Sequence, residues 1–240
     1  MNIALVGYGK MGKTIETIAV ERGHTIVSII TSKTNKKELA AMLQKADVVI
    51  EFTNPESTVE NILKCFTAGV PVVCGSTGWL KDWSKIEKAC KDQNGSLLYA
   101  SNFSIGVNIF FELNKKLASL MAGQPSYDIE ITEIHHTKKK DAPSGTAIRL
   151  AEQIIEEIPQ KNKWIKEKSN DRSDLIIHSE RIDPAPGTHY VKYSSDIDDI
   201  EIIHTAHNRK GFALGAVLAA EFLKNKKGIY SMKDVLSMPC

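Results

Sequence analysis

Residues 2–12 read NIALVGYGKMG, a short apolar run that leads directly into the motif G-x-G-x-x-G. After the motif, the apolar side chains between Met11 and Ala19 recur at the spacing of one helix face, which predicts an amphipathic helix. A second apolar run follows at residues 25–30. We therefore predict a strand at residues 3–6, a helix and a second strand, the βαβ unit that opens a parallel sheet.

In this position the motif is typical of a dinucleotide-binding loop. Its first glycine permits the tight turn, the second lets the backbone approach a pyrophosphate, and the third permits close packing of the helix on the strand. The helix N-terminus adds free N–H groups for the anion. The residues that we expect to bind the cofactor here are Gly7, Tyr8, Gly9, Lys10, Met11 and Gly12. The alternative is a glycine-rich turn with a structural role only.

The residues after the second strand bear on which nucleotide binds. In such folds an acidic residue about 20 positions onward holds the ribose 2′-hydroxyl, but Thr31-Ser32-Lys33 contains no acid. Hydroxyls and lysines, with Lys36 and Lys37 just beyond, suit a 2′-phosphate better than a carboxylate does. We expect NADPH as the cofactor, with NADH as the other candidate. The alternative is a basic exposed loop that binds no phosphate.

Short apolar runs alternate with helical patterns through the first third of the chain, and a different pattern begins near residue 108. The strands predicted in the first part are residues 3–6, 25–30, 48–50, 70–73 and 97–99. Beyond it we predict helices at residues 110–121, 147–158 and 212–224, strands at 128–132, 175–180 and 197–205, and a solvated polar connection at 161–174. The chain is therefore expected to form two lobes.

Composition and charge exclude several classes of protein. Of the 240 residues, 42% are hydrophobic and 25% are charged, so the chain is neither disordered nor fibrous. Thirty-one Lys and Arg against 29 Asp and Glu leave a net charge of +2, which argues against a nucleic-acid partner. No apolar run reaches the ~18–20 residues of a membrane span, and no basic leader precedes the first strand. We expect a cytoplasmic protein with no membrane partner.

The four cysteines show neither the CxxC spacing of a redox or zinc site nor the density of a disulfide scaffold. They are Cys65, Cys74, Cys90 and Cys240. We expect reduced thiols.

Residues 133–147, EIHHTKKKDAPSGTA, hold the densest group of chemically active side chains. Adjacent histidines on a strand point to opposite faces, so His135 and His136 suit two different roles better than one shared metal, and we expect no bound metal. Histidine is a natural proton donor at neutral pH, and Lys139 is placed to hold a carboxylate or to assist proton transfer. At a helix start, Ser144-Gly145-Thr146 form an anion cradle. The alternative is a solvated loop.

The same segment resembles the hallmark E-x-H-H-x-x-K-x-D-A-P-S-G-T-A pattern of the 4-hydroxy-tetrahydrodipicolinate reductase family, formerly called dihydrodipicolinate reductase, of the diaminopimelate route to lysine. Further stretches similar to family motifs are FTNP at residues 52–55, GSTG at 75–78, ASNFSIGV at 100–107 and HTAHNRKGFALGA at 204–216. The resemblance therefore spans nearly the whole chain.

The resemblance implies reduction of 4-hydroxy-tetrahydrodipicolinate, by way of dihydrodipicolinate, to tetrahydrodipicolinate with NAD(P)H. It implies that His135 is the proton donor and that Lys139 is a second donor or a substrate clamp. By the same resemblance, His136 contacts the small-molecule substrate, and Gly145 and Thr146 hold one of its carboxylates. The residues that it places against the nicotinamide are Gly75, Ser76, Thr77, Ala100, Ser101, Asn102 and Phe103.

An architecture is also implied. The resemblance predicts a Rossmann-like parallel-sheet dinucleotide-binding domain, residues 1–103 together with 209–240, and a smaller α+β domain with a mixed sheet, residues 104–208, for substrate binding and oligomerisation. It further implies a homotetramer. Two other hypotheses stay open: another small nicotinamide enzyme, such as an amino-acid dehydrogenase, and a regulatory module that binds NADPH without oxidising it. The hallmark pattern favours the reductase over both.

Overall fold

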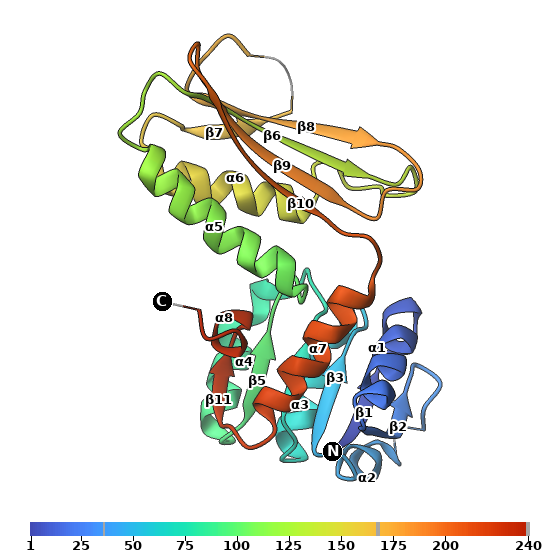
Figure 1. The fold of residues 1–240 in the computed structure, drawn as a ribbon. Coiled ribbons are helices and arrows are strands. Elements are labelled where there is room, and N and C mark those ends of the chain that lie inside the picture. The colour runs from blue at the N-terminus through green and yellow to red at the C-terminus, as the bar shows by residue number, and fades with distance from the viewer. Residues whose placement is uncertain (36, 167–168, 239–240) are drawn as a thin grey trace. The chain divides into compact units, whose positions relative to one another are not determined.

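The computed structural model describes residues 1–35, 37–166 and 169–238 (Figure 1). The chain divides into two compact units. The first unit joins residues 1–105 to the chain from Arg209 onward, and the second unit is Gly106–Asn208.

The first unit is built on a sheet of six parallel strands among the described residues. The strands are β1 (Asn2–Val6), β2 (Thr25–Ile30), β3 (Val48–Glu51), β4 (Val72–Cys74), β5 (Ser96–Tyr99) and β11 (Gly228–Tyr230), in the order β11-β5-β4-β3-β1-β2. The predicted Rossmann-like parallel sheet is therefore confirmed. Of these strands, only β11 had no counterpart in the prediction, because its three residues directly follow a lysine-rich stretch and do not form an apolar run as those around β4 do.

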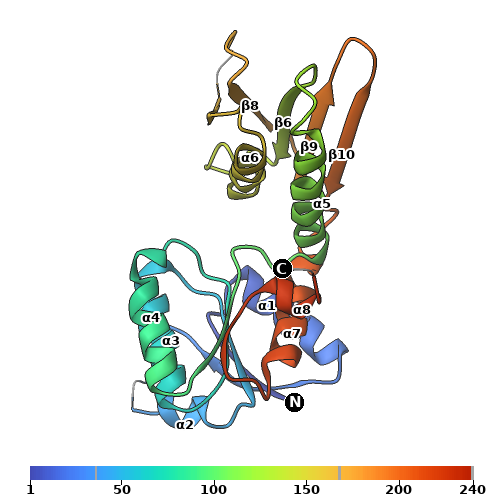
Figure 2. The same ribbon diagram turned by 90° about the vertical axis from the view of Figure 1, so that its left-hand side faces the viewer.

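Helices cover both faces of this sheet (Figure 2). The helices on one face are α1 (Lys10–Glu21), α7 (Lys210–Leu223) and α8 (Met232–Val235), and those on the other are α2 (Leu39–Leu43), α3 (Pro55–Thr67) and α4 (Trp83–Asp92), which the short 3₁₀ helix η1 (Leu80–Asp82) precedes. Successive residues of β1 point to opposite faces of the sheet. Leu5 packs with α1 and α7, whereas Ala4 and Val6 pack with the helices of the other face. Burial of both faces explains why the strands are continuous apolar runs.

The strand order reverses at β1, since the chain passes from β1 outward to β2 and then returns to β3 on the other side of β1. In open parallel sheets, ligands bind at such a reversal, outside the carboxyl ends of the strands. The G-x-G-x-x-G loop follows β1 at this point, and the loop that begins at Phe52 follows β3 beside it. The topology therefore assigns the glycine loop to the expected binding edge.

The second unit is a mixed five-stranded sheet, within the described residues, with helices on one face (Figure 1). The strands are β6 (Asp128–His135), β7 (Lys163–Ile165), β8 (Asp174–Arg181), β9 (Thr188–Ser194) and β10 (Asp199–Thr205), in the order β10-β9-β6-β8-β7, and the helices are α5 (Ile105–Met121) and α6 (Gly145–Glu157). Strand β6 is parallel to β8 and antiparallel to β9. Ile131, Leu150 and Ile177 belong to the core between sheet and helices.

Two parts of the second unit differ from the sequence prediction. The polar segment 161–174 is not simply a solvated connection: it contains β7, and Lys161 is buried, with its Nζ donating to the carbonyls of Arg172 (2.7 Å) and Asp174 (2.9 Å). Strand β9 was not predicted, although His189, Val191 and Tyr193 alternate as buried residues along it. Both segments are polar in composition, and tertiary pairing determines their structure.

Cys65, Cys74 and Cys90 are buried and free, as expected for reduced thiols, whereas Cys240 lies outside the described residues. Burial raises the pKa of the Cys65 and Cys74 thiols far above its ordinary value. Within the described part of the chain, none of the helices combines the length and the apolar character needed to cross a bilayer.

Candidate functional site

The glycine loop after β1 is closely packed at its first and third glycines. Gly7 has φ +94°, and a Cβ placed there would lie 2.0 Å from the carbonyl oxygen of Phe52. A Cβ on Gly12 would lie 2.5 Å from the carbonyl oxygen of Gly7. Neither position accepts a side chain without moving backbone, so the glycines bring β1, β3 and α1 together.

The second glycine has a different environment. Gly9 is the N-cap of α1; no side chain of the described chain caps this helix end, and a Cβ on Gly9 would meet no described atom within 4 Å. The first N–H groups of α1, at the positive end of the helix dipole, are therefore not capped by a side chain of the described residues. This cradle fits a pyrophosphate. Of the other residues in the loop, Lys10 is exposed, Met11 is half-buried, and the Tyr8 hydroxyl donates to Glu16.

The loops after β4 and β5 lie at the same edge of the sheet. Ser76 Oγ accepts a hydrogen bond from the Thr53 N–H (2.8 Å), and the Ser76 carbonyl accepts one from Trp79 Nε1 (2.8 Å). A Cβ on Gly75 would lie 2.2 Å from the Phe52 ring. These contacts join the loops after β3 and β4. The remaining predicted cofactor residues of this edge are Thr77, Ala100, Ser101, Asn102 and Phe103, which follow β4 and β5.

Phe103 differs from its neighbours, because its side chain is buried in the core and packs against Phe52 with the rings tilted and their centroids 5.6 Å apart. A Cβ on Gly215 of α7 would lie 1.7 Å from the Phe103 carbonyl oxygen. Phe103 therefore anchors the loop, and its exposed neighbour Ser101 is better placed to meet a ligand.

Hydroxyl and lysine side chains follow β2. Thr31, Ser32 and Lys33 are exposed, and the Thr31 N–H donates to Thr34 Oγ1 (2.9 Å) in a local turn. Lys37 is also exposed, whereas Lys36 lies outside the described residues. This turn presents cations and hydroxyls at the strand end where the ribose of a dinucleotide is usually bound.

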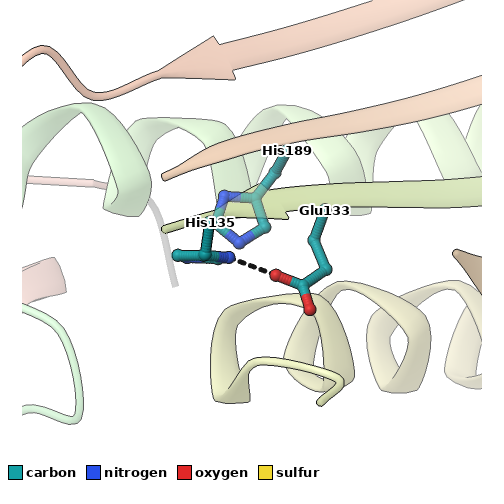
Figure 3. Close-up of side chains that lie close together, drawn as sticks. All are labelled: Glu133, His135 and His189. Carbon is teal, nitrogen blue, oxygen red and sulfur yellow. Dashed lines mark hydrogen bonds and ion pairs between the residues drawn. The ribbon is translucent and has the colours of Figure 1, made fainter. Parts of the chain in front are cut away.

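In the second unit, a buried carboxylate lies beside two histidines (Figure 3). Alternation along β6 directs Glu133 and His135 to the helix-covered face of the sheet. Glu133 is 0% exposed, and its Oε2 pairs with His135 Nδ1. Its Oε1 accepts hydrogen bonds from Arg181 Nη2 (2.8 Å) and from the Ser144 N–H (3.3 Å). Both carboxylate oxygens are therefore engaged.

These contacts set the charge of the carboxyl group. Burial disfavours the ionised form of Glu133, but the hydrogen bonds from His135 and Arg181 outweigh it and lower the pKa of Glu133 to about 2. Glu133 is therefore a carboxylate at neutral pH.

His189 of β9 lies opposite Glu133 in the antiparallel pairing with β6. Its ring centroid is 5.2 Å from that of His135, with the rings edge to face, and its Nε2 is 3.1 Å from Ser144 Oγ. Burial, with the neighbouring His135 as the second cause, lowers the pKa of His189 to about 3, so this imidazole is neutral at pH 7. Across the site, a Cβ on Gly187 would lie 3.0 Å from His135 Nε2. Glycine at this position leaves room beside that nitrogen.

The loop between β6 and α6 carries the other predicted substrate residues. Lys139 Nζ pairs with Asp141 Oδ2 at 2.7 Å, and the Asp141 carbonyl accepts a hydrogen bond from Arg181 Nη2 (2.6 Å). His136 follows the strand and is half-buried, and its Nδ1 has no partner among the described residues. The structure thus brings Lys139 and His135 into one network through Arg181 and Glu133.

Helix α6 begins at this loop. Ser144 is its N-cap and accepts a hydrogen bond from the Ala147 N–H (3.2 Å). Gly145 and Thr146 are its first two residues, and a Cβ on Gly145 would meet no described atom within 4 Å. The start of α6 is therefore open at Gly145, which suits an anionic group.

A metal ion has one candidate place among the described residues, since ligand atoms of Glu133, His135 and His189 all lie within 4.8 Å of one another. Both oxygens of Glu133 already accept hydrogen bonds, one of them from the Arg181 guanidinium. The donor set suits an ion pair better than a metal centre.

Three residues of this network were absent from the sequence prediction as functional residues: Glu133, Arg181 and His189. The sequence did carry a signal that Glu133 belongs to the site, because it lies two residues before His135 and residues two apart on a strand share a face. His189 had a weaker one in the alternation along β9. Arg181 had none, because its place beside His135 depends on the parallel register of β6 with β8.

Comparison with known proteins identifies the family. Residues 1–103 match the model of the dihydrodipicolinate reductase N-terminus, and residues 106–236 match that of its C-terminus. The chain is 51% identical over 237 residues to the 4-hydroxy-tetrahydrodipicolinate reductase of Christiangramia forsetii, covering 99% of this chain and 98% of that protein. It is 36% identical over 243 residues to the enzyme of the same name from Methanocaldococcus jannaschii, covering 98% and 81%.

A solved structure has the same fold. It is the dipicolinate-bound dihydrodipicolinate reductase from Paenisporosarcina sp. TG-14, which matches with a TM-score of 0.76 at 23% identity and covers 98% of each chain. Both halves of the family model, nearly full-length relatives and the earlier motif resemblance agree, and the chain therefore belongs to the dihydrodipicolinate reductase family.

Proposed function

We propose that this protein reduces 4-hydroxy-tetrahydrodipicolinate, by way of dihydrodipicolinate, to tetrahydrodipicolinate with NAD(P)H, in the diaminopimelate route to lysine. The names of its relatives support the substrate. The observation that carries the proposal is the buried Glu133–His135 pair next to the open start of α6. A proton donor beside an anion-binding helix end is what reduction of a carboxylate-bearing ring requires.

The first unit is proposed to be the dinucleotide-binding domain. The open N-terminus of α1 at Gly9 would hold the pyrophosphate, and the loops after β4 and β5 would contact the nicotinamide through Thr77 and residues 100–102, with Ser76 and Phe103 holding the two loops in place. When bound, the cofactor supplies the hydride.

NADPH is the proposed preference. The exposed turn after β2 offers Thr31, Ser32 and Lys33, with Lys37 close by in the sequence, and it holds no acidic residue to accept a ribose 2′-hydroxyl. A 2′-phosphate pairs with lysine and hydroxyl groups, which supports this preference over NADH.

The second unit is proposed to bind the substrate. Gly145 and Thr146 would offer N–H groups of α6 to one carboxylate, and Lys139 and His136 would contact the substrate directly. Hydride addition to a conjugated imine leaves negative charge on the substrate, and His135 would quench it by donating its Nε2 proton. Lys139 is the second donor or the clamp in this arrangement.

We also propose that the second unit forms a homotetramer and that the enzyme acts in the cytoplasm. The sheet face opposite α5 and α6 carries half-buried or exposed side chains, among them Ile176, Tyr190 and Ile203. Such a face suits burial against further copies of the chain. Size-exclusion chromatography with light scattering tests the assembly, and a monomer would contradict it.

The decisive experiment is a coupled assay. A synthase generates the unstable substrate from pyruvate and aspartate semialdehyde, and loss of NADPH absorbance, then of NADH absorbance, is measured. We expect oxidation that depends on all components and is faster with NADPH. Folded protein that binds NADPH without oxidising it would overturn the proposal in favour of a regulatory module.

Two variants test the proposed donors. His135→Gln should lower kcat by roughly 10²–10⁴-fold with little effect on NADPH affinity, because it removes a positioned acid. Lys139→Met should raise the substrate KM, and a change in NADPH affinity alone would contradict its proposed place. Matched controls are His24→Gln, a histidine of the first unit that pairs with Glu221, and Lys140→Met in the same loop as Lys139. Neither control should change the rate.

A further inference from the structure

We propose that Glu133 is the positioning residue of this site: its carboxylate fixes which nitrogen of His135 meets the substrate, and Arg181 holds that carboxylate in place. The inference rests on the proposed function. It adds a buried pair that acts through His135 without touching the substrate.

The contact with Glu133 sets the orientation of the His135 ring. His135 Nδ1 pairs with Glu133 Oε2, so Nδ1 is committed to the buried side, and Nε2 is directed toward Gly187, where a side chain is absent. A histidine ring whose Nδ1–H donates to a carboxylate has a fixed ring plane, and in its imidazolium form the proton that it can give to a substrate is the one on Nε2. Glu133 therefore selects the donor atom.

Glu133 is itself held in place by Arg181. Oε1 accepts from Arg181 Nη2, and the same guanidinium donates to the carbonyls of Asp141 (2.6 Å) and Glu180 (2.7 Å). Three contacts, from His135, Arg181 and the Ser144 N–H, hold the carboxylate in one position. A fully buried carboxylate bonded to a guanidinium is both charged and immobile.

Glu133 also contacts the start of α6, the proposed substrate-binding helix end. The Ser144 N–H donates to Glu133 Oε1 (3.3 Å), and Ser144 is the residue before Gly145 and Thr146. One carboxylate thus connects the proton donor to the start of α6. Glu133 sets the position of His135 relative to the helix N-terminus, which is the distance a substrate carboxylate and its reacting atom have to match.

The charges around His135 predict how its variants respond to pH. The groups that face it are Glu133 on its own strand, Arg181 on β8, neutral His189 on β9, and the Lys139–Asp141 pair in the loop. Removing the negative charge of Glu133 disfavours an imidazolium, and removing the positive charge of Arg181 favours one. Because His135 is the proposed acid, the two substitutions should shift the high-pH fall of kcat/KM in opposite directions.

The experiment uses the full chain in the coupled assay across pH 5.5–9.5. Glu133→Gln should lower kcat by about tenfold or more, leave NADPH affinity within about twofold, and move the high-pH fall of kcat/KM to lower pH. Arg181→Met should move that fall to higher pH. The matched control is Glu156→Gln, an exposed carboxylate near the far end of α6 that lies 3.5 Å from the Arg149 guanidinium. It should match the wild type in every readout.

Two outcomes would contradict the inference, and a third would contradict the proposed function. If Glu133→Gln does not fold, Glu133→Asp retains the charge but retracts the carboxylate by one methylene, and it should lower kcat while the pH of the fall stays at its wild-type value. Wild-type kcat in the Asp variant, or an unmoved pH profile in the Gln variant, would overturn the inference. An inactive wild type would instead overturn the proposed function, which keeps the two failures distinguishable.

Discussion

The three glycines of the nucleotide loop give a prediction that separates cofactor binding from stability. Gly9→Ala changes the residue at the N-cap of α1, where φ −81° and ψ −155° are accessible to alanine and the new Cβ meets no described atom within 4 Å. Alanine is a poorer N-cap than glycine, so we expect a loss of about 1 kcal/mol or less in the free energy of unfolding.

Binding should respond much more strongly. The added methyl group occupies the space in front of the first N–H groups of α1, which is where a pyrophosphate has to approach the backbone closely. We expect the NADPH Kd to rise at least about tenfold, equivalent to about 1.4 kcal/mol of binding free energy.

The matched variant is Gly7→Ala, which should destabilise the fold instead of blocking the approach of the cofactor. Its φ of +94° costs alanine about 1–2 kcal/mol, and its Cβ would lie 2.0 Å from the Phe52 carbonyl oxygen, so β1 and β3 would have to move apart. We expect a loss of more than about 3 kcal/mol in the free energy of unfolding. Denaturant unfolding and fluorescence titration with NADPH measure both quantities. Wild-type NADPH affinity in Gly9→Ala would refute the placement of the pyrophosphate, and equal destabilisation of the two variants would refute the packing argument.

Three further predictions concern single side chains. Hydrogen bonds lower the pKa of Glu133 from 4.5 to about 2, so its ionised form stabilises the protein by about 3 kcal/mol above pH 4.5, and this contribution is lost as the pH falls from 4.5 toward 2. Denaturant unfolding of Glu133→Gln should lack that part of the pH dependence of stability. An unchanged pH dependence would contradict the assignment. Tyr193 is fully buried with no partner for its hydroxyl among the described residues, so Tyr193→Phe should leave the unfolding free energy unchanged or raise it by about 1 kcal/mol, whereas a clear loss would mean that the hydroxyl is bonded. Thr31→Glu should weaken NADPH relative to NADH by repelling the 2′-phosphate, and an unaltered ratio of the two Kd values would show that this position does not contact the ribose.

Local signals predicted most of the first unit from its sequence. The strands β1 and β2 and the face of α1 that holds Ile15 and Ile18 are determined by residues close together in the chain. The hallmark segment likewise placed His135 near the start of α6. Local pattern is sufficient where a strand is apolar throughout or where a helix repeats every three to four residues.

The rest of the site depends on pairing between distant segments. Arg181 reaches Glu133 only because β6 and β8 pair in parallel with His135 opposite Arg181, a register across 46 residues that no local pattern encodes. Lys161 has a side chain typical of solvated loops, yet two backbone carbonyls bind its ammonium group in a buried position. These placements follow from the assembled sheet, so sequence reasoning did not reach them.

The insertion of the second unit into the first has a consequence for synthesis on the ribosome. Helix α7 covers the sheet face that contains Leu5, Ile50 and Leu98, and Arg22 pairs with Glu221 across 199 positions of the chain. When β5 has left the ribosome, α7 is still more than a hundred residues from completion, which at roughly 5–20 residues per second is a delay on the order of ten seconds. During that interval the part of this apolar face that α7 covers stays exposed beside α1. We therefore expect chaperones that recognise exposed apolar segments to bind the unfinished chain until α7 completes the layer.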